Sequence, residues 1–200
     1  MVALAMGGVA GAIGGVPHAH AACGGVKHVA PSRDLTPGRA PLAIGDSVML
    51  GAYQQLKATI DTMYAAPVTG VDAAQSRQFS AGVDVIQAYK NQGALGRIVV
   101  VQLGTNGTVD PGDLDRLMGI LDDRQKVVIV NAKVPRPWEQ QVNDTLAAGV
   151  KNHKNAVLLD WHGYGGEHPE FFYEDGLHLR PEGAEAYSRF VAQALGQGSP

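Results

Sequence analysis

Ser47, Asp175 and His178 have the residue types and the spacing of a serine nucleophile assisted by a base and a carboxylate. A serine hydroxyl is a weak nucleophile, so it needs a base that is neutral at about pH 7 yet able to accept a proton. Histidine, with a reference pKa of ~6.5, is that side chain. Asp175 precedes His178 by three residues, which lets its carboxylate fold back on the imidazole Nδ1–H, fix the tautomer and stabilise the imidazolium. Together the three residues predict acyl transfer through Ser47.

Asn106 could stabilise the charge that develops during such a reaction. It lies in the sequence Gly104-Thr105-Asn106-Gly107, where its side-chain amide could donate to the negative oxygen of a tetrahedral intermediate. Asparagine is also common in glycine-rich turns because its backbone tolerates unusual conformations. A turn role for Asn106 therefore stays open beside the oxyanion role.

The other three residues also have ordinary structural explanations. Ser47 could be a helix N-cap, a position that serine favours. Asp175 and His178 could form a turn that carries a surface ion pair. The catalytic interpretation is preferred because the expected fold brings all of these residues to one edge of a sheet.

That fold follows from the alternation of short apolar runs with stretches of helical period after Pro41. Such alternation is typical of a parallel sheet covered by helices on both faces, and β-branched runs suit strands that are buried on both sides. We expect strands at 41–44, 97–103, 126–131 and 156–160, with a weaker one at 63–68. We expect helices at 48–60, 81–91, 111–122, 138–152 and 181–195. The pattern predicts a three-layer α/β/α sandwich with a five-stranded parallel sheet.

In an open parallel sheet, ligands bind in the crevice beyond the carboxyl ends of the strands. Ser47 follows the first strong strand, and Asn106 follows the strand at 97–103. Asp175 and His178 lie in the long segment after the last strand. We therefore expect a hydroxyl, an amide, a carboxylate and an imidazole on the same rim, which are the parts of a serine acyl-transfer enzyme.

Five ordered sequence blocks resemble the SGNH (GDSL-like) hydrolase family. They are similar, more specifically, to the extracytoplasmic SGNH domain of peptidoglycan O-acetyltransferases and related acyltransferase-3 proteins, and the resemblance covers residues 41–195. The blocks are GDSVMLGA at 45–52, VDAAQSRQ at 71–78, LGTNG at 103–107, VNAKVPRPWEQQVN at 130–143 and EDGLHLRPEGAEAY at 174–187.

The resemblance implies a flavodoxin-like SGNH fold and a reaction that needs no cofactor. Ser47 would be acylated, His178 would act as general base and acid, and Asp175 would orient His178. Asn106 and the backbone amides of Ser47 and Ser76 would bind the oxyanion. Many members of the family have a glycine where this chain has Ser76. Serine keeps the backbone N–H, but the close approach that glycine permits is in doubt.

The resemblance also implies a substrate and a partner. The substrate would be an acylated glycan of the cell envelope, above all O-acetylated peptidoglycan, or a small acyl ester. The membrane-bound acyltransferase-3 portion is absent from this chain, so we expect either a separate membrane protein as acyl donor or a protein that only hydrolyses esters. Candidate substrate-binding residues within these blocks are Arg77, Gln78, Arg136 and Trp138. An exposed arginine beside a tryptophan suits a sugar ring or an acidic group, although Trp138 could instead pack into the core.

Composition excludes several other classes of function. A net charge of −3, from 16 basic and 19 acidic residues, gives no basic surface for nucleic acid. The single cysteine, Cys23, excludes an intrachain disulfide framework and a multi-cysteine metal site. We expect no metal site. Four acidic and histidine residues lie near one another in the sequence, but their spacing matches no standard metal site. These residues are Asp160, His162, Glu167 and His168.

Two functions from other classes are alternatives to the enzyme. A flavodoxin-like cofactor binder is disfavoured because no glycine-rich dinucleotide fingerprint follows the first strand. A non-catalytic carbohydrate-binding module on the same fold remains an alternative, which retention of the candidate catalytic residues disfavours.

The N-terminal segment indicates export from the cytoplasm. Residues 1–26 contain no charged side chain and include Ala19-His20-Ala21, which resembles a signal with an A-x-A cleavage site, although a disordered tail is the alternative. Prolines, a glycine and mixed charge at 27–40 predict a linker. We assign the SGNH domain to 41–195 and a C-terminal tail to 196–200.

Overall fold

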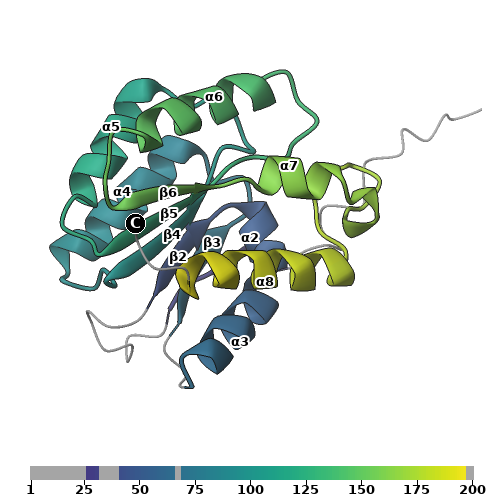
Figure 1. Cartoon of the computed structure of the whole chain (residues 1–200), viewed down its shortest axis with the longest axis horizontal. Coiled ribbons are helices and arrows are strands. Elements are labelled where there is room, and N and C mark those ends of the chain that lie inside the picture. Colours follow the sequence, from purple (N-terminus) through teal and green to yellow (C-terminus); the bar gives the residue numbers. More distant parts are fainter. Residues whose placement is uncertain (1–25, 32–40, 66–68, 197–200) are drawn as a thin grey trace, which may run out of the picture.

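The computed structural model describes residues 26–31, 41–65 and 69–196 (Figure 1). Apart from Val26, the expected export signal lies outside these residues, as does the C-terminal tail from residue 197 onward. No helix in these three ranges combines the length and the apolar character needed to cross a membrane.

A six-stranded sheet forms the centre of the structure, with the strand order β1-β3-β2-β4-β5-β6. The predicted five parallel strands are all present, and a short strand, β1, pairs antiparallel with β3 at one edge. The carboxyl ends of the two central strands are level, since Gly45 pairs with Gln102. The strands are β1 (His28–Val29), β2 (Leu42–Gly45), β3 (Gly70–Ala74), β4 (Ile98–Gln102), β5 (Lys126–Val130) and β6 (Ala156–Leu159).

Two details of the predicted sheet were wrong. The weak strand expected at 63–68 lies later, at Gly70–Ala74, and Met63 instead ends a helix. The sequence GVDAA of this strand has one β-branched residue and a buried aspartate, so its composition does not stand out. The prediction also lacked β1, whose two residues lie within the segment 27–40 expected as a linker; residues 32–40 of that segment lie outside the described residues.

Helices cover both faces of the sheet, as the three-layer prediction requires (Figure 1). Buried residues of α4, α5 and α6 pack on one face, while those of α2, α3, α7 and α8 pack on the other. The helix expected at 48–60 is divided into α2 and α3 at Ala52. The helices are α2 (Ser47–Gly51), α3 (Tyr53–Met63), α4 (Phe79–Asn91), α5 (Pro111–Ile120), α6 (Glu139–Val150), α7 (Trp161–Gly166), α8 (Pro181–Gly196) and the 3-10 turn η1 (Pro169–Phe171).

Strand β4 shows why continuous apolar runs form the middle layer. Side chains alternate between the faces of a strand, so Val99 and Val101 join the core under α4–α6 while Val100 joins the core under α3 and α8. All three are at most 1% exposed. A polar residue in this run would be buried without a partner, which explains why the strand has no polar alternation.

Two helical glycines provide a matched stability test of this packing. A Cβ on Gly119 meets nothing within 4 Å, whereas a Cβ on Gly183 would lie 2.1 Å from the carbonyl oxygen of Phe171. Gly119→Ala should raise the free energy of unfolding by about 0.5–1 kcal/mol, because alanine favours helix. Gly183→Ala should lower it by about 1–3 kcal/mol, because backbone must move. Urea unfolding of both variants checks the pair. Equal stabilisation by the two substitutions would contradict the close approach of α8 to η1.

Candidate functional site

Ser47 is the first residue of α2, directly beyond the carboxyl end of β2. The turn between strand and helix is tight, since a Cβ on Gly45 would lie 2.4 Å from the Cβ of Met49. Asp46 is the N-cap, and its carboxylate accepts the N–H of Val48 at 3.0 Å. The N-cap explanation for Ser47 is therefore excluded. Ser47 lies on the expected edge but is only 4% exposed, so its neighbours hold the hydroxyl in place.

The structure brings Ser47, His178 and Asp175 together in one hydrogen-bonded chain. His178 Nε2 lies 3.1 Å from Ser47 Oγ, and His178 Nδ1 lies 2.6 Å from Asp175 Oδ2. An ionised carboxylate can only accept, so the Nδ1 proton belongs to the bond with Asp175. Nε2 is then left to accept the serine proton, which is the arrangement that a general base requires.

Asp175 is held in its ionised form by its surroundings. Partial burial of the carboxyl opposes ionisation, but the bond from His178 and the backbone N–H groups of His178 and Leu177 outweigh it and lower the pKa of Asp175. Both backbone bonds are 3.0 Å long. An ionised Asp175 can orient the imidazole and stabilise its protonated form.

The loop that carries Asp175 and His178 is closed at its base. Phe172 and Leu179 form a β-bridge and are 4% and 3% exposed. Within the loop, the N–H of Tyr173 donates to the carbonyl of His178 at 2.8 Å. Gly176 supplies the left-handed backbone that the turn needs, with φ 65°. The apolar base therefore anchors the loop to the core.

Asp46 connects the loop after β2 with the loop after β4. Its carboxylate has no exposed surface and accepts the hydroxyl of Thr105 at 2.7 Å. Gln102 donates to the same carboxylate and accepts the N–H of Met49. Burial raises the pKa of Asp46, although these hydrogen bonds oppose the shift. This structural role of Asp46 was not predicted from the sequence, where its place inside the GDS motif was the only signal.

Asn106 faces the loop after β3. Its Nδ2 lies 3.1 Å from the carbonyl oxygen of Arg77 and 3.2 Å from Thr105 Oγ1, so each amide hydrogen has an acceptor. Asn106 does not have positive φ, whereas Gly104 and Gly107 do, at 122° and 146°. The explanation that Asn106 serves a left-handed turn is therefore excluded. Donation to a substrate oxygen would replace one of the two existing contacts.

The loop after β3 places Ser76 and Arg77 in opposite environments. Ser76 is exposed and has φ 57°, a left-handed conformation that favours glycine. The Arg77 side chain is only 7% exposed and pairs with Asp72 at 2.6 Å. Burial of the guanidinium against Asp72 argues against the predicted contact of Arg77 with substrate. Gln78 is exposed as the N-cap of α4, and its substrate role stays a prediction.

The two remaining candidate binding residues lie in the loop after β5. This loop borders the Asp175–His178 turn, since a Cβ on Gly176 would lie 3.4 Å from Pro135 Cγ. Arg136 is exposed, and its substrate role stays a prediction. Trp138 is partly buried against the α4–α6 core, and its indole Nε1 is buried without a hydrogen-bond partner in the described part of the chain. The packing explanation for Trp138 is therefore favoured.

The polar residues considered for a metal site serve separate structural contacts. His162 pairs with Glu139 at 3.1 Å, and His168 pairs with Glu170 at 2.9 Å. Asp160 caps α7 by accepting the N–H of Gly163. Within residues 26–31, 41–65 and 69–196, no three His, Cys, Asp or Glu side chains gather in a group that could hold a metal ion.

No family model matches the chain, but individual proteins do. It is 32% identical over 156 residues to the peptidoglycan O-acetyltransferase OatA of Listeria monocytogenes, an alignment that covers 77% of this chain and 24% of that protein. It is 34% identical over 154 residues to YrhL of Bacillus subtilis, which is provisionally named a peptidoglycan O-acetyltransferase, with 77% and 23% covered. The chain therefore spans about a quarter of the length of these relatives.

Solved structures confirm the fold. The C-terminal catalytic domain of Streptococcus pneumoniae OatA superposes with a TM-score of 0.68 at 21% identity, covering 80% of this chain and 94% of that one. A GDSL-like lipase from Bacteroides thetaiotaomicron superposes with a TM-score of 0.61 at 14% identity, covering 82% and 90%.

Proposed function

From the SGNH hydrolase fold of this chain and its homology to proteins named peptidoglycan O-acetyltransferases, we propose that it is a serine-dependent carbohydrate O-acyl esterase or O-acetyltransferase. It acts outside the cytoplasm on acyl esters of cell-envelope glycan. The observation that carries the proposal is the continuous chain from Ser47 Oγ through the His178 imidazole to the Asp175 carboxylate, with separations of 3.1 and 2.6 Å.

In the first half of the reaction, Ser47 Oγ attacks the acyl carbonyl of the donor ester. His178 Nε2 takes the hydroxyl proton as the new C–O bond forms, and Asp175 stabilises the resulting imidazolium. Collapse of the tetrahedral intermediate expels the alcohol, which receives the proton from His178. Ser47 is left as an acyl ester.

The oxyanion of that intermediate needs donors near Ser47 Oγ. We assign this role to two backbone N–H groups, those of Ser47 at the start of α2 and of Ser76 in its left-handed turn. The third donor is Asn106 Nδ2, after exchange of one of its present acceptors for the substrate oxygen. Preorganised donors of this kind commonly supply a large part of the rate enhancement.

In the second half, an acceptor hydroxyl attacks the acyl group on Ser47 with His178 again as base. Water as acceptor makes the protein an esterase, and a sugar hydroxyl makes it a transferase. In the transferase version, a separate membrane protein supplies the acyl group. Export of the chain, which the apolar segment 1–26 suggests, places the site beside its glycan.

Replacement of the nucleophile tests this function. Ser47→Ala should lower the hydrolysis rate of a small acetyl ester by roughly 10⁴- to 10⁶-fold, because no other group can carry the acyl chain. Ser80→Ala, on α4, is the matched control and should keep the wild-type rate. Circular dichroism of both variants establishes that they are folded.

The same assay, repeated with a chito-oligosaccharide, separates the two versions of the reaction. Acetate alone, measured by mass spectrometry, indicates an esterase, and acetylated sugar indicates a transferase. A Ser47→Ala protein with near-normal turnover would contradict the mechanism. A wild-type protein that binds the sugar but neither turns over esters nor reacts with a fluorophosphonate at Ser47 would be the non-catalytic carbohydrate-binding module.

Substitution of Asn106 tests the side-chain oxyanion donor. Asn106→Ala should lower kcat by roughly 10²- to 10³-fold with little change in KM, because the contact is made only in the transition state. Asn106→Gly should lose as much, since the backbone of Asn106 does not need the freedom of glycine. Asn152→Ala, at an exposed site after α6, serves as control. Retention of most of the rate by folded Ala and Gly variants would leave only the backbone donors.

A further inference from the structure

The Arg77 guanidinium links the carboxyl end of β2 with the neighbouring strand β3. Its Nη1 donates to the carbonyl of Gly45 at 3.1 Å and to the carbonyl of Asp72 at 2.9 Å. Its Nη2 donates to the Asp72 carboxylate at 2.6 Å. Gly45 lies two residues before Ser47, so one side chain of the loop after β3 holds the strand end that carries the nucleophile.

Asp72 supplies the counter-charge that lets a guanidinium occupy this buried place. Both side chains are 7% exposed, and a buried charge is tolerated only when it is paired and hydrogen-bonded. Two further groups approach the carboxylate of Asp72: the hydroxyl of Tyr89 donates at 2.8 Å, and His28 Nε2 lies 3.2 Å away. Burial, reinforced by Asp72, raises the pKa of Tyr89, so the phenol stays a donor.

The backbone of Arg77 completes the connection to the third loop. Its carbonyl accepts the amide of Asn106 at 3.1 Å, and the residue before it is Ser76. Arg77 is therefore in contact with or adjacent to segments that carry all three proposed donors. Its guanidinium is buried and engaged by Gly45 and Asp72, so we expect any effect on the reaction to be transmitted through those segments.

We propose that Arg77 is a positioning residue that sets the spacing between Ser47 and the oxyanion donors of the other two loops. This inference rests on the proposed function. The planar fork of arginine can serve a carboxylate and two carbonyls at once, whereas the ammonium of lysine is a single point of charge. Arg77→Lys therefore keeps the charge near Asp72 but cannot keep all the contacts.

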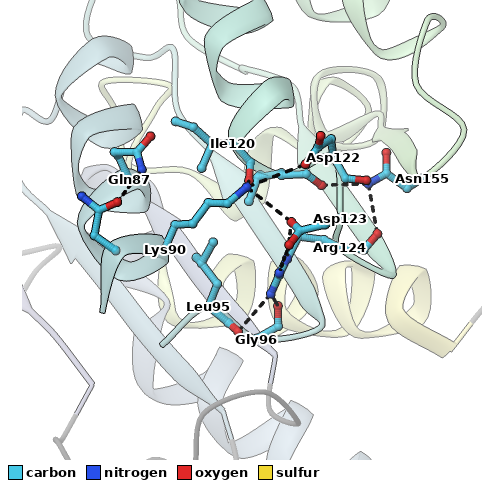
Figure 2. A network of polar contacts seen from close by, with 11 residues as sticks. Gln87, Lys90, Leu95, Gly96, Ile120, Asp122, Asp123, Arg124 and Asn155 are labelled. Carbon is cyan, nitrogen blue, oxygen red and sulfur yellow. Dashed lines mark hydrogen bonds and ion pairs between the residues drawn. The ribbon is translucent and has the colours of Figure 1, made fainter. Parts of the chain in front are cut away.

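Arg124 offers a control at the amino ends of the strands, opposite the ends that carry the candidate site (Figure 2). Its guanidinium also donates to two carbonyls, those of Leu95 and Gly96 at 3.3 Å, and to a carboxylate, that of Asp123. These residues precede β4 and β5, so they lie at the amino ends of the strands, while Ser47 lies beyond the carboxyl ends. Lys90 is also in this network, within 3.5 Å of Asp123.

The test compares Arg77→Lys with Arg124→Lys in ester hydrolysis and thermal unfolding. Arg77→Lys should lower kcat by roughly 10- to 100-fold and change KM by less than about 2-fold, because displaced donors weaken only the transition state. Arg124→Lys should lower the melting temperature less, because its pair with Asp123 is partly exposed, and should leave kcat unchanged. Rates are measured well below both unfolding transitions, so that they refer to folded protein.

Three outcomes separate the possibilities. Unchanged kcat in folded Arg77→Lys, or an equal loss in Arg124→Lys, would overturn the inference while the proposed function stands. Absence of Ser47-dependent turnover in the wild-type protein would overturn both. Should Arg77→Lys fail to fold, Asp72→Asn replaces it. This variant retains Arg77 but removes its counter-charge. The inference then requires a loss of kcat at similar KM, smaller than the roughly 10- to 100-fold loss expected for Arg77→Lys.

Discussion

The fully buried carboxylate of Asp46 is the constraint on which the arrangement of the site depends. Removing a carboxylate from water is unfavourable unless donors surround it, so the segments that provide those donors must converge. Val48 donates from the start of α2, and Thr105 donates from the loop after β4. Asp46 itself adjoins Ser47, and Thr105 adjoins Asn106. The requirement to supply donors to one buried carboxyl group thus brings together the loops that carry the proposed nucleophile and the proposed oxyanion donor.

Two further carboxylates, the buried one of Asp72 and the partly buried one of Asp175, do the same for the other loops. Asp72 holds Arg77, which in turn holds the carbonyl of Gly45, and Asp175 holds the imidazole of His178. The parallel sheet makes this possible because it ends its strands at one edge, where three loops of different length can meet. In the low dielectric of that edge each hydrogen bond is stronger than in water. Stability and catalytic geometry therefore depend on the same polar contacts.

The strands that could be placed from the sequence are those with continuous apolar runs, which reflect burial on both faces. The valine-rich runs of β4 and β5 could only be buried strands, and the serine, histidine and aspartate of the site were recognisable because their chemistry requires them together. Strand β3 was misplaced because GVDAA lacks the apolar run that marks its neighbours. The inward direction of the Arg77 side chain could not be predicted for a different reason: the sequence gives the position of a side chain along the chain but not its direction, and Ser76 is exposed where its neighbour Arg77 is buried. The partner that buries Arg77, Asp72, could not be identified without the fold.

Trapping of the acyl-enzyme tests most directly whether Ser47 carries the acyl group. An acetyl ester with a good leaving group makes the first half-reaction fast, so that the covalent intermediate accumulates before its hydrolysis. Acid quenching within the first turnover, followed by mass spectrometry of the intact protein and of its peptides, measures where the acetyl group resides. We expect one acetyl group per chain, attached to Ser47. Turnover with Ser47 unmodified, or an acetyl group on a different residue, would contradict it.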